Sequence, residues 1–370
     1  GTYGYGKSCL YAISQCQTIV VDSATTSAGK YTRRFMACRI ASRYDIDRGD
    51  EKGRYTGRHW WGRIAKDEII DPAESDDAAE CAASLGLESR TPAHGYGTSI
   101  LIVDPDLDQR SPEQAISAIH ETLLWDFWPK LITNDDRGPQ MEFSIRLDNH
   151  DPIRPALSDC QLLSTFADAM RKLKAGEEHE VFPIKCGNPR ADLGTLSISR
   201  ASITPRPAFD TGDSEPQIPC RCHHVALMRP AELVVKYLEG PALPTDSAEY
   251  GGVFVCNSSD EMEQAFANAE PPAHDDWIPE QLDGHEKTYV RVALRRIDEH
   301  LKEKIVPMGA EARPGTGETP LGLMSDALGG ILLTEAGSRI GGGGPGPRTT
   351  KKQPQRKRTT REVTISPPSF

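Results

Sequence analysis

The sequence predicts an α+β protein, with helices and largely antiparallel strands mixed along both halves of the chain. Three observations lead to this prediction. Apolar residues recur at helical spacing in some segments and form short runs or alternate in others, which indicates both element types. The hydrophobic share of 37% is enough to bury a core, while 32 glycines and 28 prolines indicate many loops. The length of 370 residues favours two domains.

The first hundred residues are expected to contain two helices and three strands. Residues 76–85 fit a short helix that ends before Gly86, because glycine readily adopts the left-handed backbone that closes a helix. Residues 97–104, with the sequence GTSILIVD, form the clearest strand of the chain. The remaining elements are a helix over residues 8–17 and strands over 18–22 and 34–40.

A longer helix is expected to begin after Ser111. This residue, Pro112 and Gln114 fit a hydroxyl cap, a proline in the first turn and a capping box. The helix is expected to stop at Pro129, which lacks the backbone donor that a helix needs. Its expected apolar positions are Ile116, Ile119, Leu123 and Phe127, with Leu124 and Trp128 beside them.

The second half of the chain mixes the same two element types. Strands are expected over residues 141–147, 193–199, 225–228, 233–238 and 252–256. Helices are expected over residues 162–173 and along a charged segment whose apolar face carries Val290, Leu294, Ile297, Leu301 and Ile305. The polar, proline-bearing residues 148–158 are the best candidate for a domain boundary.

Charge divides the chain into an acidic body and a basic tail. The net charge is −11, but residues 339–370 carry +7 and residues 1–338 carry −18. The tail is able to neutralise phosphates of a nucleic acid, whereas the acidic body gives no electrostatic reason to bind one. No apolar run reaches the roughly 18–20 residues that cross a bilayer, and no secretory leader is found, so no membrane partner is expected. Nine scattered cysteines suit reduced thiols in the cytoplasm.

The opening segment GTYGYGKS fits two phosphate-binding patterns. As a P-loop it supplies Gly1, Gly6, Lys7 and Ser8, where backbone amides hold phosphate, the lysine neutralises it and the hydroxyl binds magnesium. The second-motif aspartate of such a protein would come from the end of either TIVVD or SILIVD. The strand that should run into a P-loop lies outside the sequence, so this alternative stays open.

The second pattern is a resemblance to a known superfamily. The spacing of Gly1, Gly4 and Gly6, followed by Ser8 and a helix, resembles the glycine-rich lid motif of the GHKL ATPases. This superfamily contains gyrase, the ninety-kilodalton heat-shock chaperones, histidine kinases and MutL, and its MORC and chaperone branches carry a G-x-x-G-x-G segment there. A later strand in the family begins with Gly-Thr at the nucleotide site, and GTSILIVD supplies Thr98 in that position.

The resemblance extends along the chain to a group of bacterial GHKL-type ATP-binding proteins. The matching segments are GTYGYGKS, RYTGRHWWG, GTSILI, ETLLWDFWP, PAELVVKYLEG and AEPPAHDDW. The resemblance implies that residues 1–150 form the rear part of an ATPase domain. It implies that residues 151–335 form a transducer-like α/β domain, as in MutL and MORC proteins, and that residues 336–370 are a basic flexible linker.

ATP and Mg²⁺ are the cofactors that this resemblance implies, together with a homodimer that forms when ATP closes the lid. It also implies an upstream helix whose glutamate polarises water and whose asparagine holds magnesium, and an aspartate that reads adenine. The sequence begins in the glycine loop without these motifs, so we expect an N-terminal truncation. The parent protein is then expected to hydrolyse ATP, with nucleic acid as a possible target, and this chain alone to bind ATP weakly or not at all.

Each implied site residue also has a plainer interpretation. The glycines fit an ordinary turn, Lys7 a solvated helix start and Thr98 a simple strand residue. Transducer domains of MutL-like ATPases send a lysine to the terminal phosphate, and the resemblance makes Lys236 or Lys185 a candidate, although a solvated strand lysine is the simpler explanation. A non-catalytic interaction protein with a degenerate nucleotide site is therefore a third alternative beside the ATPase and the P-loop protein.

Three other clusters carry functional side chains. Trp60 and Trp61 are neighbours in a strand and face opposite sides, and we expect core packing rather than partner binding. The cysteines and histidines of residues 220–224 are too close in sequence to surround a zinc ion, so no metal site is expected. The histidine and two aspartates of residues 274–276 are expected to cap the following segment rather than act as a general base.

Overall fold

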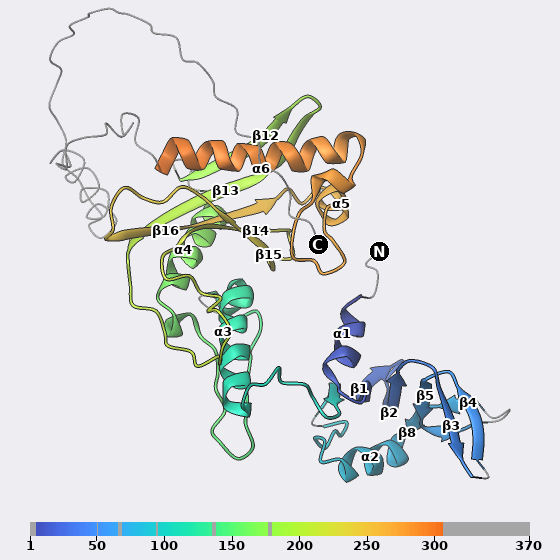
Figure 1. Ribbon diagram of the computed structural model, residues 1–370. Coiled ribbons are helices and arrows are strands. Elements are labelled where there is room, and N and C mark those ends of the chain that lie inside the picture. The colour runs from blue at the N-terminus through green and yellow to red at the C-terminus, as the bar shows by residue number, and fades with distance from the viewer. Residues whose placement is uncertain are drawn as a thin grey trace, which may run out of the picture. The chain divides into compact units, whose positions relative to one another are not determined.

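The protein is described by a computed structural model, which covers residues 5–49, 51–65, 69–93, 95–134, 138–176 and 180–305 (Figure 1). The predicted α+β class is confirmed, since helices and mainly antiparallel sheets alternate along these residues. The α-helices are α1 (Tyr5–Ile13), α2 (Ser75–Ser84), α3 (Pro112–Leu131), α4 (Leu162–Ala175), α5 (Asp260–Asn268) and α6 (Gly284–Ile305). The part of the chain that the structure describes also contains the short 3-10 helices η2 (Leu157–Asp159) and η3 (Pro279–Gln281).

The N-terminal part folds into an antiparallel sheet with strand order β5-β2-β1-β9, and β8 also pairs with β2. Its strands are β1 (Thr18–Ser27), β2 (Lys30–Ile40), β5 (Arg58–Trp61), β8 (Ala73–Glu74) and β9 (Gly97–Ile102). The strands predicted near residues 18, 34 and 97 are therefore confirmed. Two further antiparallel pairs join β3 (Tyr44–Arg48) with β4 (Glu51–Tyr55), and β6 (Arg63–Ile64) with β7 (Ile70–Asp71).

Helix α2 covers one face of this sheet through small side chains. Val20 and Phe35 of the sheet pack in one cluster with Ala78 and Ala82 of the helix, and both alanines are fully buried. Because alanine ends at Cβ, the helix approaches the sheet closely. The predicted helix and its stop are confirmed, since Gly86 follows with a left-handed φ of 70°.

The start of α3 is confirmed, but its buried face differs from the expected one. The backbone N–H of Gln114 donates to Ser111 Oγ at 3.2 Å, and the Ser111 N–H donates to Gln114 Oε1 at 3.0 Å, which completes the capping box. Ile119 is 48% exposed. Ile116, Leu123 and Phe127 are half-buried, whereas Leu124 and Trp128, expected beside them, are fully buried. Trp125 and Leu131 are also buried. The helix is thus turned so that the larger tryptophan rings enter the core.

Pro129 does not end α3, which continues to Leu131. A proline at this position leaves the carbonyl of Trp125, four residues earlier, without its helical donor. The hydroxyl of Tyr237 donates a hydrogen bond to that carbonyl instead. Tyr237 also accepts a hydrogen bond from Trp128 Nε1 at 2.9 Å and stacks on Trp125, with ring centroids 3.9 Å apart. A residue from a distant strand therefore compensates for the proline.

The second sheet has the order β12-β13-β16-β14-β15. Its strands are β12 (Val181–Gly187), β13 (Arg190–Ser202), β14 (His223–Met228), β15 (Val234–Glu239) and β16 (Ala248–Cys256), and only β14 and β16 among them pair in parallel. Helix α4 packs on one face and α6 on the other (Figure 1). Successive residues of β14 alternate accordingly, because Val225 belongs to the α6 core and Ala226 to the α4 core.

Most predicted elements of this half are confirmed, including α4 and the strands β13 to β16. Helix α6 buries Val290, Ile297, Leu301 and Ile305 of the predicted face, and Leu294 is half-buried. The strand expected over residues 141–147 is wrong, since this segment contributes only an isolated bridge between Ile145 and Ile153. Phe143 within it packs edge-on against Phe127 of α3, with ring centroids 5.6 Å apart. The remaining small pair is β10 (Thr133–Asn134) with β11 (Gly138–Pro139).

The packing of α3 is relevant to the boundary predicted at residues 148–158. This helix precedes that segment, yet it contacts α4 and β15 and shares their core. The boundary itself stays a prediction.

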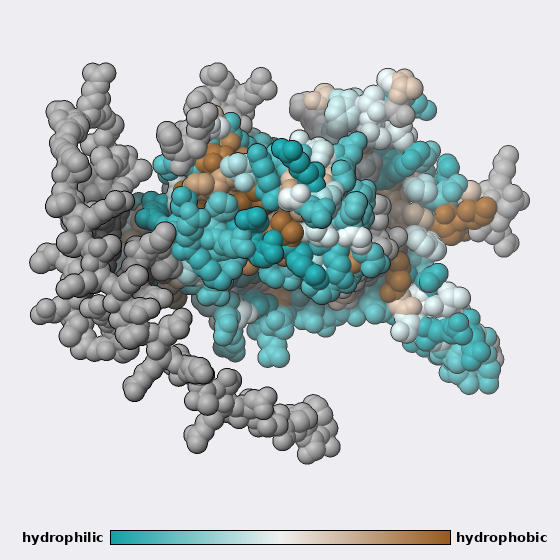
Figure 2. All heavy atoms as spheres, turned by 90° about the horizontal axis from the view of Figure 1, so that it is seen from above, coloured by the Kyte–Doolittle hydropathy of each residue, from teal (hydrophilic) through white to brown (hydrophobic). Residues whose placement is uncertain are grey.

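In the view of Figure 2, hydrophobic residues of the described surface form small separate patches within a mainly hydrophilic surface.

Gly194 provides a test of the second sheet. The register of β12 and β13 shifts beside it, its φ is +143°, and an added Cβ would lie 2.3 Å from the Val255 carbonyl oxygen. Gly194→Ala should therefore lower the free energy of unfolding by at least about 2 kcal/mol in urea titrations followed by circular dichroism. Gly187→Ala is the matched control, since an added Cβ there meets nothing within 4 Å. Equal stability of the two variants would contradict this account.

Candidate functional site

The predicted phosphate loop lies partly outside the described residues, which do not include Gly1 and Gly4. Gly6, Lys7 and Ser8 belong to the first turns of α1, which begins at Tyr5 and not at residue 8 as expected. Ser8 is exposed, and an added Cβ on Gly6 would meet nothing within 4 Å. The start of α1 is therefore open around its glycine.

The other end of α1 is fixed to the strand that carries Thr98. The backbone N–H of Gln15 donates to Asp104 O at 2.9 Å, and that of Asp106 donates to Ile13 O at 2.7 Å. The hydroxyl of Tyr11 lies beside the thiol of Cys38, and burial and this neighbouring thiol raise the pKa of Tyr11. These contacts hold the helix against the β2-β1-β9 part of the sheet.

The strand register puts α1 and Thr98 on the same face of the sheet. Cys38 lies opposite Ile19, and Thr98 lies opposite Ser23. Because directly opposite residues share a face and residues alternate along a strand, Cys38, Ile19, Ser23 and Thr98 all point to one side. The contact of Tyr11 with Cys38 places α1 on that side. Among the described residues, no hydrogen bond joins Thr98 to Gly6 or Ser8, and Thr98 Oγ1 is instead next to Ser23 Oγ.

Thr98 lies at the start of β9 and pairs with a second hydroxyl. Its Oγ1 is 2.9 Å from Ser23 Oγ, and either atom is able to donate. The preceding Gly97 has a φ of +140°, and an added Cβ would lie 3.0 Å from Arg90 Nη1. Glycine is therefore needed for β9 to begin next to Arg90. The site has two adjacent hydroxyl groups at the open end of an edge strand.

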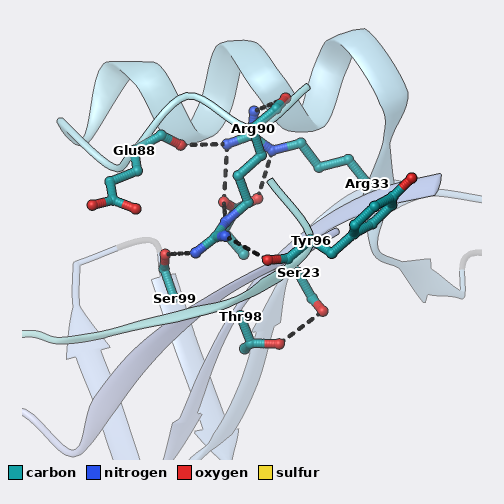
Figure 3. A network of polar contacts seen from close by, with 8 residues as sticks. Ser23, Arg33, Glu88, Arg90, Tyr96, Thr98 and Ser99 are labelled. Atoms are coloured by element: carbon teal, nitrogen blue, oxygen red, sulfur yellow. Dashed lines mark hydrogen bonds and ion pairs between the residues drawn. The ribbon is translucent and has the colours of Figure 1, made fainter. Parts of the chain in front are cut away.

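A buried ion network lies on the opposite face of the same strands (Figure 3). Asp22 has no exposed surface, and Arg33 binds it through Nε and Nη2, each 2.9 Å from a carboxylate oxygen. This hydrogen bonding raises the pKa of Arg33. Arg90 Nε lies 3.6 Å from the same carboxylate, while its Nη2 donates to Ser99 Oγ at 2.7 Å.

The carboxylate of Asp22 thus faces the guanidinium groups of Arg33 and Arg90. This leaves an excess of one positive charge near the start of β9, on the face of the sheet opposite Thr98. Arg33 also donates to the carbonyls of Glu88 and Arg90 at 3.1 and 3.4 Å, so it fixes the loop that leads into β9. Arg90 Nε is buried without a hydrogen-bond partner. The excess positive charge and the nearby hydroxyls of Ser23 and Thr98 suit an anionic group with several acceptor oxygens.

Lys236, the weak catalytic candidate, is engaged in an ion pair. Its Nζ lies 2.6 Å from Asp276 Oδ2, and both side chains are more than a third exposed. Asp276 Oδ1 also accepts the backbone N–H of Trp277 at 2.7 Å. This aspartate fixes the backbone at Trp277 but does not cap a helix, so the expected capping role of residues 274–276 holds only in this local sense. Lys185 is exposed on β12.

A cavity of about 940 Å³ lies beside α5 and the start of α6, and sequence reasoning missed it. Its most buried carboxylate is Glu270, with 1% of the side chain exposed, which accepts hydrogen bonds from Arg229 Nε at 2.6 Å and Trp277 Nε1 at 3.4 Å. His274 Nδ1 lies 2.7 Å from the same group. Glu270 therefore orients His274 and is itself saturated by donors. Glu270, His274 and Trp277 all belong to the segment AEPPAHDDW, which was the sequence signal that could have indicated this cavity.

The cysteine and histidine cluster of residues 220–224 has a single close pair. Cys222 Sγ lies 3.7 Å from His224 Nδ1. Burial raises the pKa of Cys222 to about 12, so this thiol resists the deprotonation that zinc binding requires. Within the described ranges no group of three or more His, Cys, Asp or Glu side chains is placed to hold a metal ion.

Trp60 and Trp61 are not core residues as expected, because they are 48% and 49% exposed. They face opposite sides of β5, which among the described strands pairs with β2 alone. Core packing was expected, but neither tryptophan belongs to a core cluster of the described residues.

Comparisons of the chain with family models, with curated proteins and with solved structures find no match. None of the helices that the structure describes is both long enough and apolar enough to span a membrane.

The ion network provides a test of the site. Asp22→Asn leaves the buried Arg33 without its counter-charge, and should lower the free energy of unfolding by about 3–5 kcal/mol. Asp45→Asn is the matched control, since Asp45 forms an exposed pair with Arg54 at 3.1 Å and should change stability by less than about 1 kcal/mol. Urea unfolding measures both. A loss below about 1 kcal/mol for Asp22→Asn would show that the network does not stabilise the sheet.

Proposed function

We propose that this chain forms part of a GHKL-type ATP-binding protein that works as an ATP-driven conformational switch. In this proposal the amides of Gly1, Gly4 and Gly6, with Lys7 and Ser8, close over the phosphates, and Thr98 binds them from the sheet. The observation that carries the proposal is the shared face of α1 and the Thr98–Ser23 hydroxyl pair, with the excess positive charge of the Asp22 network behind it.

The antiparallel sheet favours this proposal over a P-loop protein. A P-loop joins a strand to a helix within βαβ units, whose strands pair in parallel. Helix α1, which begins within GTYGYGKS, instead leads into β1, whose two neighbours β2 and β9 are both antiparallel to it. Asp22, one of the two aspartates considered for a second P-loop motif, is buried against Arg33, which makes it unsuited to bind magnesium.

The implied cofactors fit the described residues to different degrees. Hydroxyl groups at a strand end and a positively charged background suit the phosphates of ATP. The resemblance assigns Mg²⁺ to an asparagine of a motif that this sequence does not contain.

The proposal also includes ATP-dependent homodimerisation, nucleic-acid contact through the basic tail of residues 339–361 and a cytoplasmic location. The nine scattered cysteines support that location.

Thr98 tests the nucleotide site in the full-length gene product. Thr98→Ala removes a hydroxyl donor to phosphate and should weaken ATP binding about tenfold or more in calorimetric titrations. Thr26→Ala is the matched control, because Thr26 is an exposed β1 residue on the opposite face of the sheet and should leave ATP affinity unchanged. Equal ATP affinity of both variants and the unchanged protein would contradict the proposed site. Tight binding without turnover would favour the degenerate, non-catalytic alternative.

Lys236 tests the proposed link between the second sheet and the nucleotide. If its ammonium leaves Asp276 to contact the terminal phosphate, Lys236→Ala should reduce the ATP turnover of the full-length protein at least about tenfold, because one charge-assisted contact is lost. Steady-state phosphate release measures this. Unchanged turnover removes Lys236 from the mechanism and leaves Lys185→Ala as the remaining variant to compare.

A further inference from the structure

The segment from Lys30 to Arg63 is basic within an otherwise acidic body. It contains ten Lys or Arg and four Asp or Glu residues, whereas residues 1–338 together carry −18. Arg43 within it and Arg63 at its end are exposed and form no ion pair with a side chain that the structure describes. Guanidinium groups without a carboxylate partner are available to bind phosphate.

Four aromatic rings form a continuous row within this segment, which we call the aromatic row: Tyr44, Tyr55, His59 and Trp61. The rings of Tyr44 and Tyr55 stack with centroids 5.3 Å apart and an interplanar angle of 15°. Tyr44 Oη lies 3.0 Å from His59 Nε2. His59 in turn stacks beside Trp61, with centroids 6.0 Å apart. The β3-β4 hairpin and strand β5 are thereby joined through side chains.

The backbone holds this row in place. The Ala41 N–H donates to the Gly57 carbonyl oxygen at 2.9 Å, which fixes the turn before β5 to the end of β2. Gly57 has a φ of +79°, and an added Cβ would lie 2.2 Å from the Ser42 carbonyl oxygen, so only glycine fits there. The Arg39 guanidinium lies 5.5 Å from the centroid of the Tyr44 ring. The row is therefore formed before any ligand binds.

The row is also accessible. Trp61 is 49% exposed and Tyr55 is 41% exposed, and neither belongs to a core cluster of the described residues. Exposed aromatic residues lose the stabilisation that burial would provide. Trp60 is equally exposed, but it points to the opposite face of β5, away from His59 and Trp61. The chain therefore offers its own matched control.

We propose that the aromatic row and the surrounding arginines bind single-stranded nucleic acid. Every base has a π-face that is able to stack on Trp61 or Tyr55, and the arginines neutralise the phosphates between the bases. A duplex would use only the charges, because its bases are already stacked on one another. An apolar protein partner would use the rings but would leave the unpaired arginines desolvated. This proposal does not depend on ATP binding at Thr98.

The test compares tryptophan variants of the full chain. Biotinylated 20-nucleotide oligo(dT) and oligo(U) are immobilised, and affinities are measured by biolayer interferometry at fixed salt. Trp61→Ala should weaken binding about 5- to 150-fold, as expected when an aromatic stacking platform is lost. Trp61→Phe, which keeps a π-face, should bind more tightly than Trp61→Ala. Trp60→Ala should stay within twofold of the unchanged protein. Equal effects of Trp60→Ala and Trp61→Ala would overturn the proposal.

Two further measurements separate this surface from other sources of binding. Arg63→Gln should reduce the slope of log affinity against log salt by about 0.7, whereas Arg58→Gln, on the Trp60 face of β5, should leave the slope unchanged. Deletion of residues 339–361 should leave the Trp61 effect intact. These variants also test the proposal if Trp61→Ala fails to fold. A Trp61 effect that disappears with the tail, a salt slope that Arg63→Gln leaves unchanged, or competition by polyaspartate equal to that of the oligonucleotide would each overturn it.

Discussion

The N-terminal sheet is built around one requirement, which is that a carboxylate in the middle of a buried strand must be neutralised. Asp22 lies in the apolar run of β1 and has no contact with solvent. Arg33, from the next strand of the same hairpin, binds it in a bidentate arrangement, and Arg90 approaches from the loop before β9. The start of β9, and with it Thr98, is therefore positioned by a charge on the other side of the sheet.

The same device recurs in the second sheet, where buried glutamates hold loops against strands. Glu249 binds Arg206 and also accepts the backbone N–H of Cys222 at 3.0 Å, so a long loop is tied down at both ends. Glu270 joins Arg229 to the segment that carries His274 and Trp277. In each case an arginine matches the planar carboxylate with two donors. Loops rich in glycine and proline, which have little regular hydrogen bonding of their own, thereby acquire fixed positions.

Local patterns predicted the elements well, because alternation and helix caps depend on neighbouring residues. The capping box of α3 and the strand GTSILIVD are examples. The failures required information from distant residues. Pro129 remains inside a helix because Tyr237, more than one hundred residues later, supplies the missing donor. The exposure of Trp60 and Trp61 follows from the edge position of β5, which the segment itself does not encode. The sequence alone did not identify Arg33 and Arg90 as the partners of Asp22. An aspartate directly after the apolar run TIVV nevertheless indicates that a counter-charge must lie nearby.

The five tryptophans of the chain are distributed unevenly between its two sheets. Trp60 and Trp61 are exposed near the N-terminal sheet, whereas Trp125, Trp128 and Trp277 are buried in the cores of the second sheet. Indole emission shifts to longer wavelength in water, and soluble quenchers such as acrylamide reach only accessible rings. The intrinsic fluorescence of the protein therefore contains two separable signals, one red-shifted and quenchable and the other blue-shifted and protected. Unfolding of either part is observable without attaching a label.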